Sequence, residues 1–358
     1  MKTIAGIVAE FNPFHEGHRY LIETVKTTLK PDVLVIILSG NFSSRGLPCM
    51  ETRTVRTQKA LEAGADLVIG LPSVYAMQSA DYFAKYAIQS LKTAGVNVLC
   101  FGSESNDPDL LDQQLQTLET MDKDPSLSLA RNAAKNGVAP RPNDILALQY
   151  LKTAKALDIA IRPLQRSPNF ESATSIRSHY FSSQGRELHP DFEPHQNWDS
   201  YYPLLRYALL ETPASRLAGF FLVEEGIENR MIKAARDAQN WTEFLEAAVS
   251  KTYSRARIQR TAMMILMQIE KEEVKANASF FAIQVLGFNT TGQKHLASLP
   301  EDAPVYSRIR EVPEPLKTWL IKSDTLYSFF TTRPAGWKVQ TLSDSNPQDN
   351  TSTKNEKV

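Results

Sequence analysis

The first half of the chain alternates short apolar runs with stretches in which apolar residues recur at helical spacing. The runs are residues 4–9, 33–38, 66–69, 96–101 and 159–164, and their nearly continuous apolar character is typical of strands buried on both faces. Helical spacing is clearest over residues 21–29, 56–63, 82–91 and 145–157. Strands separated by helices pair in parallel through right-handed crossovers. The pattern therefore predicts an α/β fold built on a doubly wound parallel sheet.

The pattern changes near residue 190. Pro190, Pro194 and Pro203 mark a region that is typical of a linker. Beyond it, helical spacing returns over residues 229–238, 241–249 and 257–269, and no clear buried strand follows. We therefore expect a sheet domain over residues 1–185 and a mainly helical C-terminal domain over residues 186–338. Residues 339–358 are almost entirely polar, which predicts a disordered tail.

Length and cysteine content narrow the class of protein. The 358 residues are too many for one ordinary core, which agrees with two domains. No apolar run approaches the roughly 20 residues that span a bilayer, and the start of the chain lacks the pattern of a cleavable signal. Only two cysteines occur, Cys49 and Cys100, and neither has a partner at metal-ligand spacing. We therefore expect no membrane partner, no disulfide framework, no zinc site and a reducing, cytoplasmic compartment.

A pair of histidines follows the first predicted strand. In an open parallel sheet, ligands bind beyond the carboxyl ends of the strands. His15 and His18 are three residues apart where the first helix should begin, so both side chains can lie on one side of its first turn. That turn also presents free backbone N–H groups and the positive end of the helix dipole. The combination predicts a phosphate site, at which Gly17 would leave space for an adenine ring or a ribose.

A second candidate phosphate contact follows the fifth predicted strand. Ser172 and Thr174 belong to a Ser/Thr-rich turn, and their hydroxyls suit phosphate oxygens at a helix N-terminus. Arg177, one turn further on, can bind the β- and γ-phosphates. The alternative is an ordinary helix N-cap, a role that serine and threonine often fill. Arg166, at the end of the fifth strand, is another candidate for a phosphate or ribose contact.

Positive charge gathers in the predicted helical domain. Basic and acidic residues are equal in number, at 40 each, so the total charge neither supports nor excludes nucleic acid, which responds to local patches. Cations beside an exposed aromatic residue are typical of RNA backbone binding with base stacking. The alternative is a solvated helix face paired with nearby acids. The candidate RNA-binding residues are Arg230, Lys251, Tyr253, Arg255, Arg257 and Arg260.

These motifs resemble two nested groups of known enzymes. The strand followed by His15-Glu16-Gly17-His18 resembles the HIGH-type nucleotidylyltransferase superfamily, which binds ATP on a Rossmann-like fold and attacks its α-phosphate. Further motifs resemble the bacterial tRNA(Met) cytidine acetate ligase family, in order over residues 1–335. They are AEFNPFHEGH (9–18), SGNF (39–42), RG (45–46), GADLV (64–68), QSA (78–80), FGSES (101–105), PNDIL (142–146), SATSIR (172–177), GIENR (226–230), RIQR (257–260) and VLGFN (285–289).

The resemblance implies an activity and a set of site residues. This family uses ATP to convert acetate to acetyl-adenylate, and it transfers the acetyl group to N4 of the wobble cytidine of elongator tRNA(Met). His15 and His18 would stabilise the charge that develops on the phosphates in the transition state. A magnesium ion on the phosphates is expected, with Glu10 and Asp66 as unsupported candidate ligands. The ATP site would comprise Ile7, Val8, Ala9, Glu10, Phe11, Asn12, Pro13, Phe14, Gly17, Arg19, Tyr20, Gly102, Asn143, Arg166, Ser172, Thr174 and Arg177.

Two other functions stay open. One is a nucleotidylyltransferase that acts on a small phosphorylated cofactor precursor, and the other is a non-catalytic RNA-binding relative. The chain departs from the usual family pattern at Ser43-Ser44, at Arg53 and at Gly70, and it is shortened between Arg166 and Ser172. We expect these departures to lie on loops at the functional edge of the sheet and to affect acetate or acceptor contacts. The sequence assigns neither an acetate pocket nor an oligomeric state.

Overall fold

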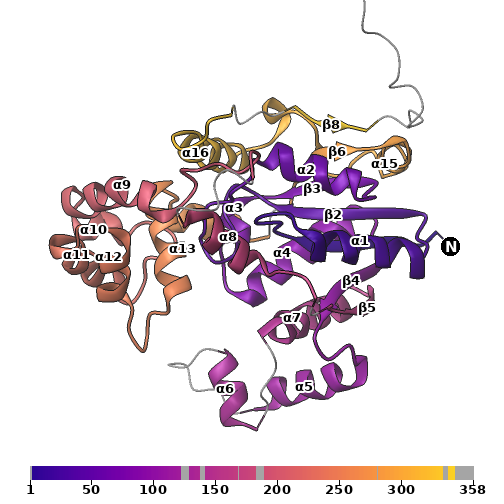
Figure 1. Cartoon of the computed structure of the whole chain (residues 1–358), viewed down its shortest axis with the longest axis horizontal. Helices are drawn as coiled ribbons and strands as arrows, with labels where there is room; N and C mark the ends of the chain where they lie inside the picture. Colours follow the sequence, from indigo (N-terminus) through magenta and orange to yellow (C-terminus); the bar gives the residue numbers. More distant parts are fainter. Residues whose placement is uncertain are drawn as a thin grey trace, which may run out of the picture.

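A computed structural model describes residues 2–121, 129–137, 142–167, 169–182, 189–279, 281–333 and 338–342. Within these ranges, the side chains of residues 129–131 and 142–143 are not described. The described residues form a sheet layer with helices on both faces and a group of helices to one side of it (Figure 1). No helix in the described part of the chain has both the length and the apolar character to cross a membrane.

The five predicted strands form the parallel core of the sheet. They are β1 (Ile4–Ala9), β2 (Val33–Ser39), β3 (Leu67–Leu71), β4 (Val98–Ser103) and β5 (Ala160–Gln165). Their order is β5-β4-β1-β2-β3, and each neighbouring pair is parallel. The order reverses at β1, so the carboxyl end of β1 lies at the switch point where such sheets bind ligands. The predicted doubly wound, Rossmann-like sheet is confirmed.

Alternate side chains of the central strands enter different cores. In β2, Leu34, Ile36 and Leu38 pack with residues of α1 (Glu16–Thr28) and α2 (Arg53–Glu62). Val33, Val35 and Ile37 belong instead to the core that includes α4 (Ala80–Thr93) and α7 (Pro142–Ala156). Because both faces of these strands are covered, their sequences are apolar throughout, which is why the pattern of the chain revealed them.

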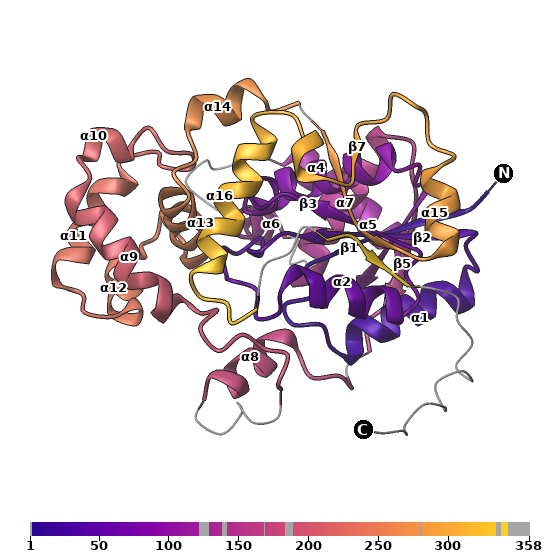
Figure 2. The same cartoon turned by 90° about the horizontal axis from the view of Figure 1, so that it is seen from above.

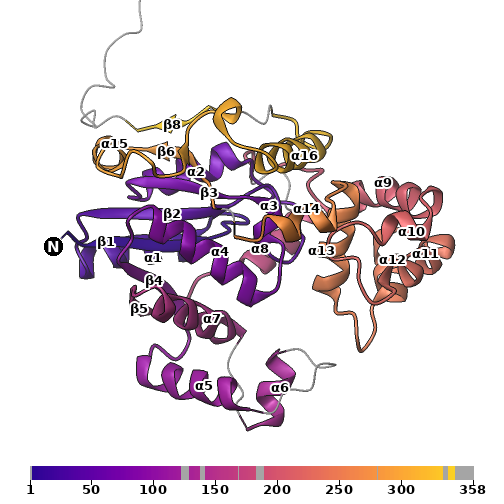
Figure 3. The same cartoon turned by 180° about the vertical axis from the view of Figure 1, so that it is seen from behind.

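The remaining helices of the first half surround this framework. Figures 1 and 3 show α5 and α6 below the sheet, beyond α7. The helix α8 follows β5, after the turn that contains Ser172. The bounds are α3 (Ser73–Ala76), α5 (Pro108–Thr120), α6 (Leu129–Lys135) and α8 (Ala173–Phe181).

A compact group of helices lies beside the sheet, as Figures 1 and 2 show. It comprises α9 (Trp198–Glu211), α10 (Ala214–Leu217), α11 (Ile227–Asp237), α12 (Trp241–Ala248) and α13 (Arg255–Leu266), followed by α14 (Lys271–Ala276). Trp198 and Trp241 stack at 4.1 Å between ring centroids in its interior. The helices predicted from residues 229, 241 and 257 onward are thus present. Pro203 was assigned to a linker, but it lies inside α9.

The prediction of no buried strand after residue 190 is wrong. Strand β6 (Ile283–Phe288) is buried and joins the main sheet antiparallel to β3, and β7 (Val305–Tyr306) and β8 (Gln340–Thr341) pair with β6. Gln284 and Gly287 interrupt the apolar run, and its pairing partner is more than 200 residues away, so periodicity did not reveal it. The elements that accompany these strands are α15 (Thr290–Leu296), the 3-10 helix η2 (Ile309–Glu311) and α16 (Leu316–Ser328).

The predicted disordered tail over residues 339–358 is wrong at its start. Residues 340–341 form β8 and are part of the sheet, although they fall within the predicted disordered tail. Residues 343–358 lie outside the described residues. The domain boundary at residue 185 stays a prediction, and Figure 1 shows that α15, α16 and β6 return to the sheet after the helical group.

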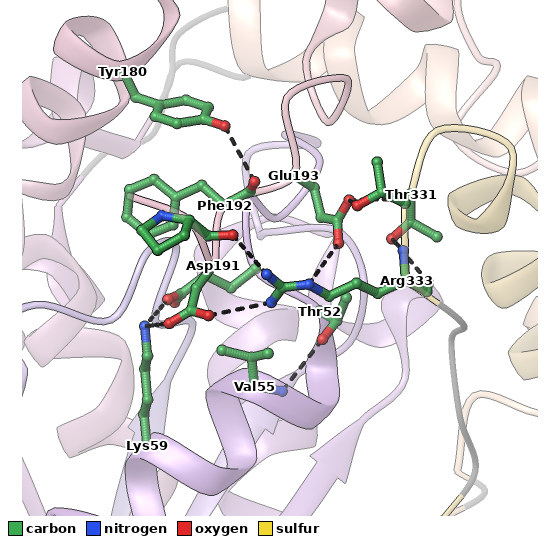
Figure 4. A network of polar contacts seen from close by, with 12 residues as sticks. Thr52, Val55, Lys59, Tyr180, Asp191, Phe192, Glu193, Thr331 and Arg333 are labelled. Atoms are coloured by element: carbon green, nitrogen blue, oxygen red, sulfur yellow. Dashed lines mark hydrogen bonds and ion pairs between the residues drawn. The ribbon is translucent and has the colours of Figure 1, made fainter. Parts of the chain in front are cut away.

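A polar network ties the segment between α8 and α9 to α2 and to the residues after α16 (Figure 4). Asp191 pairs with Lys59 of α2 at 3.5 Å and with Arg333 at 3.3 Å. Glu193 is almost fully buried and accepts hydrogen bonds from the backbone N–H and the hydroxyl of Thr332, at 2.7 and 2.8 Å. The segment that leads to the helical group is therefore held against the sheet domain at several points.

Arg56 holds the carboxyl ends of β1 and β2 together. It is fully buried in α2, and its guanidinium donates to the backbone oxygens of Glu10 and Ser39 at 2.8 and 2.9 Å and of Gly40 at 2.6 Å. Its Nε donates to the backbone oxygen of Glu51 at 3.2 Å. A planar group with five fixed donors can satisfy several carbonyls that diverge from the end of a sheet.

We predict that Arg56→Lys lowers the free energy of unfolding by about 2–4 kcal/mol, because a single ammonium group leaves buried carbonyls without a donor. Urea denaturation followed by circular dichroism measures the change. Arg162→Lys is the matched control, since Arg162 is exposed on the edge strand β5 and its replacement should have little effect. Equal midpoints for both variants would contradict the role of Arg56.

Candidate functional site

Two histidines cap the first helix with their own side chains. His15 is the N-cap of α1, and its Nδ1 accepts from the backbone N–H of Gly17 at 3.0 Å. The Nδ1 atom of His18 accepts from the backbone N–H of His15 at 3.3 Å. The two rings lie 3.8 Å apart between centroids. In each ring Nδ1 is therefore the acceptor, which leaves Nε2 to carry the proton of the neutral imidazole.

Burial keeps both imidazoles neutral. Burial, followed by the charge of Arg166, lowers the pKa of His15 from 6.5 to about 4. Burial, followed by the proximity of His15 and Arg166, lowers the pKa of His18 well below its ordinary value. Both rings are thus hydrogen-bond donors through Nε2 near neutral pH, and the positive charge at this end of the sheet comes from arginines.

The histidines stand between two adjacent cavities. We call the first chamber the cavity of about 220 Å³ lined by Gly17, Tyr20, Gly102, Phe170 and Glu171, among others. We call the second chamber the cavity of about 410 Å³ lined by Glu10, Ser44, Arg45, Phe83 and Arg177, among others. The residues common to both chambers are Val8, His15, His18, Leu21, Leu146, Tyr150, Arg166 and Ser172. The predicted phosphate site is therefore the shared wall of a two-part cleft.

Most of the predicted ATP-site residues line this cleft. Apart from the histidines they are Ile7, Val8, Ala9, Glu10, Phe11, Asn12, Gly17, Tyr20, Gly102, Arg166, Ser172, Thr174 and Arg177. Pro13, Phe14 and Arg19 line neither chamber as the described residues define them. Phe14 is buried and donates its N–H to Glu51 at 2.8 Å, and Arg19 pairs with Glu16 at 3.6 Å. Asn143 begins α7, and its side chain lies outside the described residues.

Gly17 and Gly102 both leave room for a neighbouring side chain. A Cβ atom on Gly17 would lie 2.8 Å from Cε1 of His15, so this glycine leaves space for the imidazole that caps the helix. A Cβ atom on Gly102 would lie 3.0 Å from Cγ of Arg166, so this glycine admits the stem of Arg166 beside the end of β4. The sequence predicted that Gly17 would leave space for the nucleotide itself. The immediate effect of the two glycines is to place a histidine and an arginine.

The serine-rich turn caps a helix and also lines the cleft. Ser172 is the N-cap of α8 and accepts from the N–H of Ser175 at 3.1 Å, yet it also lines both chambers. Arg177 donates to the backbone oxygen of Asn12 at 2.5 Å and to the hydroxyl of Thr174 at 3.1 Å. Burial lowers the pKa of Arg177, and Glu10 acts in the opposite direction. Arg177 thus joins α8 to the turn after β1.

Several lining residues were not among the predicted site residues, although Ser43 and Ser44 were expected at the functional edge of the sheet. Phe83 comes from α4, Tyr150 from α7, and Ser43, Ser44 and Arg45 from the loop after β2. The first chamber adds Phe101, Gln165, Ser167, Phe170 and Glu171. The position of Ser43–Arg45 after a buried strand was a usable signal, whereas Phe83 and Tyr150 read as ordinary apolar helix positions. Only helix packing directs them toward the cleft.

The predicted RNA-binding residues separate into internal and exposed groups. Arg230 donates to the backbone oxygens of Ala247, Ala248 and Val249 at 2.5–3.0 Å, so it caps the end of α12. Arg260 donates to the backbone oxygen of Gln78 at 2.7 Å and links α13 to the sheet domain. Burial lowers the pKa of Arg260 to about 10.

The other predicted RNA-binding residues lie at the start of α13. Arg257 pairs with Glu225 at 3.1 Å and lies over the ring of Tyr253, 5.2 Å from its centroid. Lys251 and Arg255 are exposed. Among the predicted RNA-binding residues, Lys251 and Arg255 are therefore the exposed cations.

The acidic residues of the cleft limit how a metal ion can bind. No group of three or more His, Cys, Asp or Glu side chains within the described ranges could enclose a metal ion. Asp66 precedes β3, at the opposite end of the sheet, and accepts from the N–H of Leu34 at 2.8 Å and from Lys26 at 3.3 Å. Asp66 is therefore excluded as a magnesium ligand.

Comparison with known proteins identifies the family. The HIGH Nucleotidyl Transferase family model matches residues 1–340. The chain is 33% identical to the tRNA(Met) cytidine acetate ligase of Streptococcus equi subsp. zooepidemicus, with 91% of this chain and 93% of that protein covered. It is 35% identical to the enzyme of the same name from Streptococcus agalactiae serotype Ia, with 86% and 88% covered. The chain belongs to the tRNA(Met) cytidine acetate ligase family.

Solved structures agree with this assignment. TmcAL of Thermotoga maritima in its apo form is 25% identical, has a TM-score of 0.80, and is matched over 95% of this chain and 100% of its own. TmcAL of the same organism bound with alpha-thio ATP is 24% identical with a TM-score of 0.79 over the same shares of the two chains. The latter likeness shows the shared fold.

Two of the departures from the ligase family pattern lie away from the cleft. Arg53 binds Asp324 of α16 through both guanidinium nitrogens, at 3.1 and 3.3 Å, and Asn41 donates to the same carboxylate at 2.6 Å. Gly70 lies inside β3, where a Cβ atom would meet Gln284 of β6 at 3.2 Å. Arg53 belongs to α2 and Gly70 to β3, so neither lies on a loop, and neither lines the chambers. Both positions instead support the return of the chain to the sheet. Ser43 and Ser44 do line the second chamber.

We predict that the imidazole of His15 titrates near pH 4 in the folded chain, as followed by the NMR shift of its Hε1 proton. In urea the same proton should titrate near the ordinary value of about 6.5. Because the pKa is lower in the folded chain, protonation of the unfolded state makes the fold less stable as the pH falls from about 6.5 toward about 4. His15→Asn assigns the signal, and a folded-state midpoint at or above 6 would contradict the burial argument.

Proposed function

We propose that this protein uses ATP to convert acetate to acetyl-adenylate and transfers the acetyl group to N4 of the wobble cytidine of elongator tRNA(Met). In the first step, a carboxylate oxygen of acetate attacks the α-phosphorus and pyrophosphate leaves. In the second step, the cytidine amine displaces AMP from the acetyl carbon. The observation that carries the proposal is the wall of imidazole donors shared by two chambers, because both steps take place around one phosphate.

The shared wall suits the α-phosphate. The imidazoles of His15 and His18, with their Nε2–H donors, and the cation of Arg166 border both chambers. Donors that are already oriented stabilise charge as it develops, without reorganisation of water. Neutral imidazoles can do this without binding the free phosphate so tightly that AMP is retained. His15 and His18 are accordingly assigned to transition-state stabilisation.

The first chamber suits the adenosine half of ATP. Tyr20 and Phe170 lie 5.6 Å apart between ring centroids and line this chamber with Gly102 and Ala147. An adenine ring needs such an apolar, partly aromatic slot with few polar contacts. A relative with the same fold has been solved with alpha-thio ATP bound, which supports ATP as the nucleotide. The names of the curated relatives support acetate and tRNA(Met) as the other substrates.

Magnesium fits this cleft as a companion of the triphosphate. Mg²⁺ keeps several waters and commonly binds through substrate phosphates with one or two carboxylates. Glu10 and Glu171 are the acidic side chains among the described lining residues, in separate chambers. The ion would thus be held mainly by phosphate oxygens, where it would neutralise the charge of the leaving pyrophosphate.

We predict that the protein exchanges pyrophosphate into ATP only when acetate is present, and that His18→Asn slows this exchange by about 10²–10³. Asparagine can still accept from the N–H of His15, so the cap is kept while the Nε2 donor is lost. His18→Gln, which restores a donor further along the side chain, should recover part of the rate. Removal of one such donor costs about 10²–10³ in rate. Isotope exchange measures the effect.

The same assay separates the alternative functions. Exchange that needs a phosphorylated small molecule instead of acetate would indicate a cofactor-precursor enzyme. An absence of exchange under all conditions, with tRNA binding intact, would indicate a non-catalytic RNA-binding protein. Loss of tRNA affinity in His18→Asn would contradict the separation of the ATP and tRNA sites.

We predict that Lys251→Ala combined with Arg255→Ala weakens tRNA binding and spares acetate-dependent exchange. Each lost phosphate contact on single-stranded RNA should reduce the slope of log K against log salt by about 0.7. Filter binding at several salt concentrations measures this slope. Arg308→Ala with Arg310→Ala removes the same charge beside β7 and is the control. We call the surface formed by Lys251 and Arg255 the basic surface. Equal slopes in the two double variants would overturn the assignment of this basic surface to RNA binding.

A further inference from the structure

On the basis of the proposed function, we propose that the second chamber receives the cytosine base and that Glu10 takes the proton released from its N4 amino group. Glu10 follows the last residue of β1 and lines this chamber. Among the described residues it is the only acidic side chain there. The family resemblance placed Glu10 in the ATP site, whereas its surroundings indicate a part in the transfer step.

Glu10 is held in place through its carboxylate and through its backbone. Its Oε1 accepts from the backbone N–H of Ser44 at 2.5 Å, and its own backbone oxygen accepts from buried Arg56 at 2.8 Å. One carboxylate oxygen is thereby used for positioning. A carboxylate has a second oxygen with its own lone pairs, which can accept from a substrate amine.

The loop that holds Glu10 also contacts the helical group. Gly46 has φ of 72°, and a Cβ atom there would lie 2.7 Å from the backbone N of Arg260 in α13. The indole N–H of Trp198 donates to the backbone oxygen of Gly46 at 3.0 Å. Only glycine combines this backbone conformation with so close an approach. The wall of the second chamber is therefore packed directly on the helices that carry the basic surface.

This contact decides which chamber RNA can reach. Arg255 is the first residue of α13, so this exposed cation lies on the order of 7 Å along the helix from the contact of Arg260 with Gly46. The residues found only in the first chamber come from α1, β4, α7, β5 and the segment before α8. An RNA strand on the basic surface therefore meets the second chamber first.

The second chamber has the chemistry that a displaced pyrimidine needs. Its volume of about 410 Å³ falls within the range of small-molecule sites, and Phe83, Leu47 and Tyr150 offer apolar and aromatic surface. Single-stranded bases are bound by stacking and by hydrogen bonds to their Watson–Crick edge. A carboxylate that accepts from N4 is the characteristic contact to cytosine. Burial, followed by Glu10, raises the pKa of Tyr150, so its hydroxyl remains a donor.

The transfer step forms one bond, breaks one bond and moves one proton. The N4 nitrogen forms a bond to the acetyl carbon, and the bond between that carbon and the phosphate oxygen breaks. The electron pair of the broken bond leaves on AMP. One N4 proton passes to the free oxygen of Glu10, and the amide product keeps the other. Both reacting groups meet at the wall of His15 and His18 that separates the chambers.

The decisive variant is Glu10→Gln, whose amide oxygen can still accept from Ser44. We expect the ratio of N4-acetylcytidine formation to acetate-dependent exchange to fall by about 10²–10⁴, the usual contribution of a general base. Mass spectrometry of digested tRNA and isotope exchange measure the two rates at saturating tRNA. Glu119→Gln is the control, since Glu119 is exposed on α5 and pairs with Lys152 at 3.7 Å. Its ratio should equal that of the wild type.

Hydroxylamine provides a second readout. It attacks acetyl-adenylate without a protein base, so Glu10→Gln should lose acetylcytidine far more than acetyl-hydroxamate. An equal loss of both products would assign Glu10 to nucleotide or metal binding and overturn the inference. An unchanged transfer ratio would overturn it as well, as would a fall in tRNA affinity large enough to account for the lost transfer.

If the Gln variant does not fold, Glu10→Asp offers the same comparison with a shortened carboxylate, and its ratio should fall by at least 10-fold. A wild-type protein that forms no acetylcytidine would instead refute the proposed function itself. The inference about Glu10 can be refuted by itself only if the wild-type protein forms acetylcytidine.

Discussion

The buried guanidinium of Arg56 is the constraint on which the functional edge of this protein depends. The carboxyl ends of parallel strands expose carbonyls that have no partner within the sheet, and burial makes such groups costly. Arg56 satisfies those of Glu10, Ser39 and Gly40 with one planar group. By doing so it fixes the turn after β1 relative to the loop after β2. The turn leads to His15, and the loop supplies the N–H that orients Glu10.

The histidine pair links fold and chemistry in a similar way. Most helices are capped by small polar side chains, but here imidazoles accept the free N–H groups of α1. Each cap uses Nδ1 and leaves Nε2–H for a ligand, so the interaction that begins the helix also determines the tautomer. Gly17 is required because any larger residue would meet the ring of His15. Capping, tautomer and the proposed phosphate recognition all depend on one short motif.

The helical group is attached to the cleft, and this attachment can connect the two steps of the proposed reaction. Gly46 packs on the backbone of α13, Arg260 reaches the backbone of Gln78, and Asp324 of α16 binds Arg53 and Asn41. These contacts join segments that are far apart in the chain to the loops at the carboxyl ends of β2 and β3. A macromolecule bound to these helices would therefore lie on elements that pack directly against the wall of the second chamber, where the acceptor base would react.

The sequence determined the central sheet and the position of the histidine pair, and only the tertiary structure decided what most other side chains do. Strands β1 to β5 were predictable because burial on both faces makes their runs apolar, and His15 and His18 because they follow such a strand. Strand β6 was missed because its interrupted run becomes a strand only beside β3. Arg230 and Arg260 resemble exposed cations in sequence, yet packing directs them to backbone carbonyls. Periodicity tells which face of a helix is apolar, but not which neighbour that face will meet.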